Sequence, residues 1–209
     1  MSDIAHYFTP INLVEISNDS VYDSTQIGGS MTAFTNSEDF PELEGIDIAI
    51  IGVCEDRRSE KSLGASNAPD EVRKFLYQLY PGSIEPKMID LGNINAGFEV
   101  EDTYYALANT IEVLVKKNII PVIIGGSQDL TYAQFRGYEK LEQTINIATV
   151  DAEFDLGNPE EKLTNKSYLG KIILHQPNYL FNYSNIGYQT YLVSPASINM
   201  MTKLYFDSY

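Results

Sequence analysis

The chain has 209 residues, 44% of them hydrophobic, which is enough to bury the core of one globular domain. Its 14 Lys and Arg against 29 Asp and Glu give a net charge of −15 at pH 7. This charge would repel nucleic acid and anionic membrane surfaces, so the sequence predicts neither as a partner. Because it has no apolar run of membrane-spanning length, no leader-like start and a single cysteine, Cys54, a cytoplasmic location is expected.

The first 45 residues are rich in Ser, Thr, Asn, Asp and Gly and show little hydrophobic periodicity. We expect residues 1–45 to form an irregular lead-in to one α/β domain over residues 46–209. The domain opens with the apolar run IDIAIIGV, typical of a strand buried on both faces of a parallel sheet. A loop and a helix follow, with Pro69 in the first turn and one face predicted to be buried: Val72, Phe75, Leu76 and Leu79.

Strands and helices then alternate along the chain. The pattern predicts strands at 87–92, 119–126 and 145–151, helices at 102–118 and 127–141, one or two strands within 179–194, and a helix at the last residues. This alternation favours right-handed crossovers and helices on both faces of the sheet. The predicted fold class is therefore α/β, a three-layer α/β/α domain with a mainly parallel sheet.

Polar residues follow two of these strands, as GGSQD and as DAEFD. The carboxyl ends of parallel strands are where open α/β sheets bind ligands. Asp151 and Glu153 are two residues apart and leave the same face of the chain, and Asp155 can reach them from the loop. If these carboxylates meet, they need a cation or a neighbouring Lys or Arg. The alternative is a solvated turn.

The glycine pair at 125–126 allows two interpretations. A glycine pair before a helix can cradle an anion, but the sequence has neither the spacing nor the lysine of a nucleotide-binding loop. A tight turn in which Ser127 or Asp129 caps the following helix is favoured.

Together, the two motifs resemble those of the ureohydrolase superfamily, which comprises arginases, agmatinases and formimidoylglutamases. The segments AIIGVCED, LGASNAPDEVRKFL and MIDLGNI are similar to earlier parts of the same family, and the chain is most similar to formimidoylglutamase-like proteins. The resemblance implies an arginase-like fold. It also implies a metal-dependent hydrolase in which two Mn²⁺ ions activate water to attack the guanidino or formimino C–N bond of a small-molecule amidine.

The chain departs from the family at the metal ligands. The resemblance places Gln128 at the first metal-binding His and Glu153 at the second, while Asp151 and Asp155 keep the family's carboxylates. The distal Ser-x-Asp-x-Asp motif, which supplies two further carboxylates, is absent, so the C-terminal part of the family domain is not in these residues. An all-oxygen ligand set shifts the preference from Mn²⁺ toward Mg²⁺ or Ca²⁺, or abolishes tight binding.

Three interpretations follow from this departure: an active hydrolase, a non-catalytic binding or interaction subunit on the same fold, and a fragment of a longer enzyme. Each is compatible with a homo-oligomer. His175 falls near the position where arginases carry a His-Gly segment that shuttles protons, which makes it a catalytic candidate, although a structural role is favoured.

Overall fold

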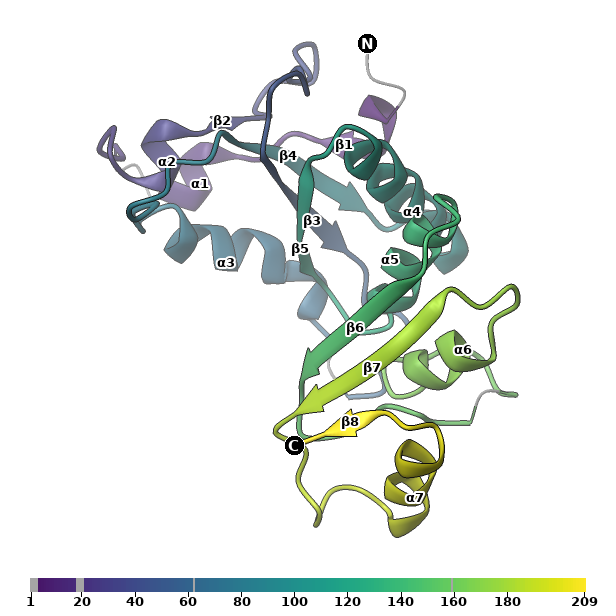
Figure 1. The fold of residues 1–209 in the computed structure, drawn as a ribbon. Coiled ribbons are helices and arrows are strands. Elements are labelled where there is room, and N and C mark those ends of the chain that lie inside the picture. The colour runs from purple at the N-terminus through teal and green to yellow at the C-terminus, as the bar shows by residue number, and fades with distance from the viewer. Residues whose placement is uncertain (1–3, 18–20, 62, 159) are drawn as a thin grey trace.

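The computed structural model describes residues 4–17, 21–61, 63–158 and 160–209 (Figure 1). It confirms the predicted α/β class with mainly parallel strands. The domain elements in chain order are β3 (Ile48–Cys54), η2 (Ala65–Asn67), α3 (Ala68–Leu76), β4 (Met88–Asn95), α4 (Val100–Lys116), β5 (Ile120–Gly125), α5 (Leu130–Glu139), β6 (Ile145–Val150), α6 (Tyr168–Leu174), β7 (Leu180–Ile186), α7 (Pro195–Lys203) and β8 (Asp207–Ser208).

The lead-in is less irregular than expected. It contains η1 (Ala5–Tyr7), β1 (Phe8–Thr9), α1 (Leu13–Ser17), α2 (Ile27–Ser30) and β2 (Thr32–Ala33). These elements are too short to show hydrophobic periodicity, but β1 pairs antiparallel and β2 pairs parallel with β4. The lead-in therefore extends the sheet of the domain as well as wrapping it.

The first sheet has the strand order β1-β4-β3-β5. Its central strand, β3, pairs in parallel with β4 and with β5. In the pair with β5 the register runs from Ile48 opposite Ile120 to Val53 opposite Gly125. The helices α3 and α4 lie on opposite sides of this sheet (Figure 1), as right-handed crossovers that run in opposite directions require. This explains why β3 carries no charged residue.

The second sheet has the order β6-β7-β8, also parallel. Although β5 and β6 are consecutive strands joined through α5, no pairing between them is found in the described part of the chain. The parallel sheet is thus in two pieces, each with its own hydrophobic core. The helix predicted at the last residues, 200–209, is confirmed in part: residues 200–203 complete α7, whereas Asp207–Ser208 form β8.

The helices α4 and α5 pack closely against one another beside the first sheet. Their contact depends on Gly137, where an added Cβ would lie 2.6 Å from Ile111 Cβ. Because α5 connects β5 of the first sheet to β6 of the second, its packing against α4 holds the connection between the two sheets close to the first sheet.

The buried face of α3 differs from the prediction. Val72, Phe75 and Leu79 are exposed and Leu76 is partly buried, whereas Arg73 is fully buried. Arg73 donates from Nε and Nη2 to the two carboxylate oxygens of the equally buried Asp90 on β4, at 2.8 Å each. The buried residues of α3 are therefore Pro69 and Arg73, and the charge of Arg73 is balanced by its partner Asp90.

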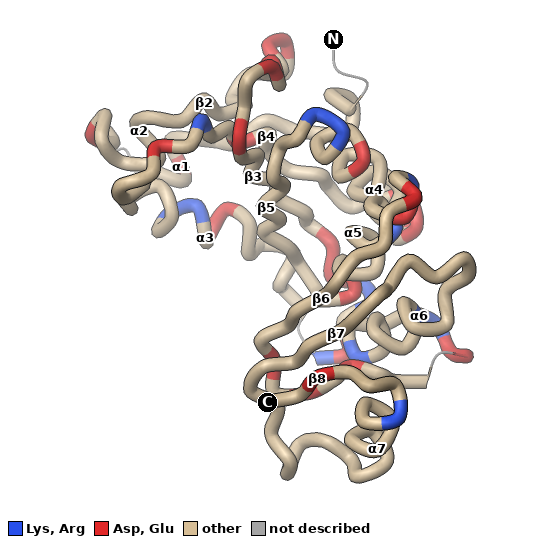
Figure 2. The backbone as a smooth tube through the Cα atoms, viewed as in Figure 1, with Lys and Arg blue, Asp and Glu red and all other residues tan. Residues whose placement is uncertain are grey.

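Charged residues lie mainly on the helices and loops around the two sheets and are not gathered in one block, and β3, β5, β6 and β7 carry none (Figure 2). This distribution is typical of a solvated acidic surface. No helix among the described residues combines the length and apolarity that a membrane span requires.

Candidate functional site

The structure brings together the polar residues that follow β5 and β6. Gln128, in the turn after β5, donates from Nε2 to Asp151 Oδ2 at 2.7 Å, and the same nitrogen lies 3.3 Å from the hydroxyl of Tyr168, the first residue of α6. The other Asp151 oxygen accepts a hydrogen bond from the Glu153 backbone N–H at 3.0 Å. Both oxygens of Asp151 are therefore engaged, and the two strand ends meet as parallel strands predict.

A lysine lies between the other two carboxylates. Lys166 Nζ is 2.9 Å from Glu153 Oε1 and 3.2 Å from Asp155 Oδ1. We refer to Gln128, Asp151, Glu153, Asp155 and Lys166 as the carboxylate site. The expected cation is thus an ammonium group of this chain, supplied from the segment that precedes α6.

Asp155 is the most constrained member of the carboxylate site. Its side chain is fully buried, its backbone has φ 48°, and neither carboxylate oxygen accepts a hydrogen bond among the described residues. Asp tolerates this left-handed conformation better than most residues. Burial raises the pKa of Asp155 to about 6, against the opposing effect of the Lys166 ammonium. A buried carboxylate without hydrogen bonds is costly, so a cation beside it is needed.

The raised pKa of Asp155 makes stability depend on pH. In the unfolded chain the pKa of an Asp is about 3.9, so between about pH 4 and pH 6 the folded state keeps a proton that the unfolded state releases. Protonated Asp155 therefore favours the folded state, and this contribution to the free energy of unfolding is lost as the pH rises from about 4 to about 6. We therefore expect Asp155→Asn to raise the free energy of unfolding at pH 7 by roughly 1–3 kcal/mol, and to add nothing below about pH 4.

Urea denaturation of wild type and variant across this range is the measurement, with the exposed Asp39→Asn as the control. An equal gain for Asp155→Asn at both ends of the range would contradict the titration.

The hydrogen bonds in the turn between β5 and α5 differ from the predicted helix cap. Asp129 does not cap α5 with its side chain; instead it accepts hydrogen bonds from the hydroxyls of Ser127 and Tyr104. Glycine is needed at 126 because an added Cβ there would lie 1.9 Å from the carbonyl oxygen of Glu55, the residue that follows β3. The tight-turn interpretation of the glycines is therefore correct, and the capping interpretation is wrong.

His175 lies outside the carboxylate site, at the end of α6. Its Nε2 is 2.8 Å from Glu139 Oε1 and its Nδ1 is 3.2 Å from the hydroxyl of Tyr132, both on α5, and its ring packs edge-on to Phe135. Seven residues of helix separate His175 from Tyr168, a distance of about 10 Å at 1.5 Å per residue. These contacts favour the structural role, in which His175 joins α6 to α5.

The donor set of the carboxylate site does not fit a pair of manganese ions. Gln128 and Glu153, where the resemblance places the family's histidines, supply no imidazole nitrogen, and an ammonium already lies among the carboxylates. In the described segments, no three His, Cys, Asp or Glu side chains converge as a metal-binding group. The residues that are present instead form a site in which the Lys166 ammonium balances carboxylate charge.

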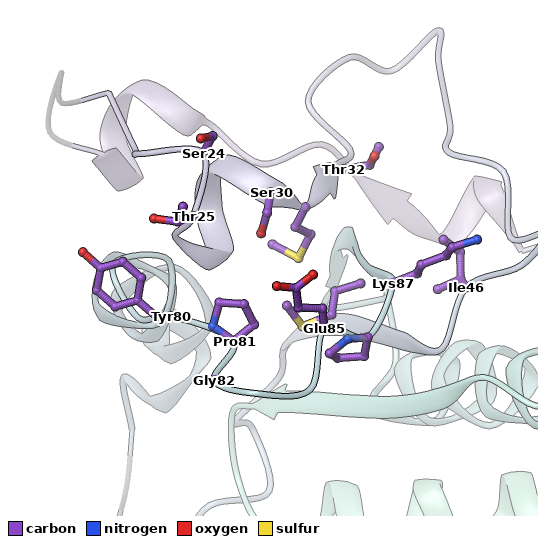
Figure 3. Close-up of a pocket in the computed structure, with 13 residues that line it drawn as sticks. Ser24, Thr25, Ser30, Thr32, Ile46, Tyr80, Pro81, Gly82, Glu85 and Lys87 are labelled. Carbon is purple, nitrogen blue, oxygen red and sulfur yellow. The ribbon is translucent and has the colours of Figure 1, made fainter.

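A cavity of about 640 Å³ lies beside the first sheet, at the amino end of β4. It is formed by the lead-in and by the turn before β4, with Tyr80, Pro81, Glu85 and Lys87 along one side (Figure 3). It contains none of the residues that the motifs singled out, so it is separate from the carboxylate site.

Two formimidoylglutamases are among the similar proteins. That of Hahella chejuensis is 29% identical over 150 residues, 68% of this chain and 46% of that protein, and that of a Geobacillus species is 32% identical over 138 residues, 63% of this chain and 40% of that protein. The chain thus spans less than half the length of these relatives.

Similar solved structures include the formimidoylglutamase of Bacillus subtilis, with a TM-score of 0.75 and 19% identity over 92% of this chain and 62% of that one. A Trypanosoma cruzi formiminoglutamase with Mn²⁺ gives a TM-score of 0.68 and 17% identity over 81% of this chain and 62% of that one. At these identities the structures establish the fold. Since residues 46–203, well over half of the chain, match the arginase family, the chain belongs to that family.

Proposed function

We propose that this chain is a non-catalytic member of the arginase family, retained as a binding or interaction subunit. The observation that supports this best is the hydrogen bond from Gln128 Nε2 to Asp151 Oδ2. At the position where the family resemblance places a metal-binding imidazole, the side chain presents an N–H group to a carboxylate. An N–H donor has no lone pair to offer a metal, so the contact satisfies Asp151 within the protein.

Metal-dependent hydrolysis of an amidine is the second candidate. It is favoured by the retained carboxylates, Asp151 and Asp155, and by similarity to proteins named formimidoylglutamase, one of which was solved with Mn²⁺. In that case the metal ligands from this chain would be Asp151, Asp155, Glu153 and the amide oxygen of Gln128, an all-oxygen set suited to Mg²⁺ or Ca²⁺ as much as to Mn²⁺.

Activity and metal content together separate the two candidates. We expect the purified chain, supplied with Mn²⁺, Mg²⁺ or Ca²⁺, to hydrolyse arginine, agmatine and formimidoylglutamate no faster than a blank that contains the metal alone. We also expect less than stoichiometric manganese by elemental analysis. The Bacillus subtilis formimidoylglutamase, assayed in parallel, is the positive control. Turnover of any of the three substrates above the blank would favour the hydrolase and reject the proposal.

A further inference from the structure

We propose that Lys166 is a built-in counter-ion that performs the electrostatic role of a metal ion in the carboxylate site, and that its removal exposes a site for one divalent cation. The inference rests on the proposed function, since it explains how a family member without its metal ligands keeps the remaining carboxylates. The exposed site would take its protein ligands from Glu153 and Asp155, the two carboxylates that Lys166 contacts, and carboxylate oxygens are the ligands that hard divalent cations prefer.

The first argument is the state of Asp155. Its carboxylate is fully buried, and neither oxygen accepts a hydrogen bond from the described residues. A buried charge in this condition requires an opposite charge nearby. Lys166, at 3.2 Å, is the one cation found in an ion pair with Asp155 among the described residues.

The second argument is that Lys166 is held in place by its backbone. Its own N–H donates to Thr164 Oγ1 at 3.2 Å, and the preceding Asn165 donates its N–H to the Arg58 carbonyl oxygen at 3.2 Å. Asn165 also accepts, through Oδ1, the N–H of Glu60 at 3.0 Å. The segment that carries Lys166 is therefore fixed to the loop after β3, and the ammonium is positioned by the fold.

The third argument is the charge balance. Lys166 lies between two carboxylates, and Asp151 is a third acidic group beside them. An isolated surface ion pair contributes little. The Lys166 ammonium contributes more than such a pair, because it contacts the fully buried Asp155 and because without it the carboxylates would repel one another.

The test removes the ammonium and measures cation binding. Lys166→Met keeps most of the apolar stem, Lys166→Arg keeps the charge, and Lys116→Met removes an ammonium from an exposed ion pair with Glu112 on α4. We expect calorimetric titration with Ca²⁺, Mg²⁺ or Mn²⁺ to show one saturable site in Lys166→Met, more than about tenfold tighter than in the wild type. Lys166→Arg and Lys116→Met should match the wild type.

Equal cation affinity in Lys166→Met and the wild type would overturn the inference, as would a gain of the same size in Lys116→Met. If Lys166→Met folds poorly, the yield of soluble protein with and without added Ca²⁺ is compared. Recovery by Ca²⁺ supports the inference, and equal yields overturn it. These outcomes are independent of the activity assay, since turnover by the wild type would reject the proposed function without changing the affinity of the variant.

Discussion

Replacing Arg73 by methionine is expected to lower the free energy of unfolding by about 3–5 kcal/mol. Arg73 and Asp90 are both fully buried, and Arg73 makes two parallel hydrogen bonds of 2.8 Å to the carboxylate. Tyr77 also donates its hydroxyl to Asp90, at 2.9 Å, but it supplies no charge. Removing the guanidinium would leave a buried carboxylate without a counter-ion, which is the costly half of breaking a buried ion pair.

Urea denaturation of the wild type and of Arg73→Met measures this loss. The matched control is Lys74→Met, which removes the adjacent cation on α3 and its exposed ion pair with Glu71. We expect it to cost less than about 1 kcal/mol. The double variant Arg73→Met with Asp90→Leu should recover part of the loss, because it removes the stranded charge as well. Equal losses in Arg73→Met and Lys74→Met would contradict a special role for the buried pair.

Restoring the family's two imidazoles is expected to raise Mn²⁺ affinity strongly only when Lys166 is also replaced. The variant Gln128→His, Glu153→His would present two neutral nitrogens beside Asp151 and Asp155. With Lys166 in place its ammonium would still oppose a cation at Asp155, 3.2 Å away. Adding Lys166→Met should increase affinity by a further tenfold or more, on the order of 1.4 kcal/mol.

Even the triple variant should not hydrolyse arginine, agmatine or formimidoylglutamate. The resemblance implies that a two-ion cluster draws on distal carboxylates that the 209 residues do not contain, and a bridging hydroxide needs both ions. Titration with Mn²⁺ and product assays against a metal-only blank are the measurements, with Gln128→Asn, Glu153→Gln as the control without imidazoles. Turnover by the triple variant would show that the distal motif is dispensable.

The sequence predicted β3 and β5 well because each is a continuous apolar run with a clear end. It failed at α3 for a physical reason. Helical periodicity places apolar residues inside, but the buried side of α3 carries Arg73, which is paired with Asp90 on β4. Two charged residues on different elements give no periodic signal, so the pair appears only when the chain is folded.

The carboxylate site was predicted in part. That Gln128 and Asp151 would meet followed from the rule that parallel strands end at one edge. Lys166 was missed because it lies in a loop eleven positions after Asp155, with no spacing that links the two. The seven-residue helix α6, which brings Tyr168 to the site, was also missed, and a helix of this length carries too little pattern to predict.

The division of the parallel sheet has a consequence for solubility. The N–H groups of β5 that pair with β3 belong to alternate residues, since Ile120 donates to Asp47 and Gly126 donates to Val53. The nitrogens of the residues between them therefore face the open edge, and the first of these residues is Pro121, which has no N–H. An unpaired strand edge is a template for aggregation, and proline at such an edge removes a donor that a second molecule would need. Pro121 thus leaves the open edge of β5 with one donor fewer for a neighbouring molecule to pair with.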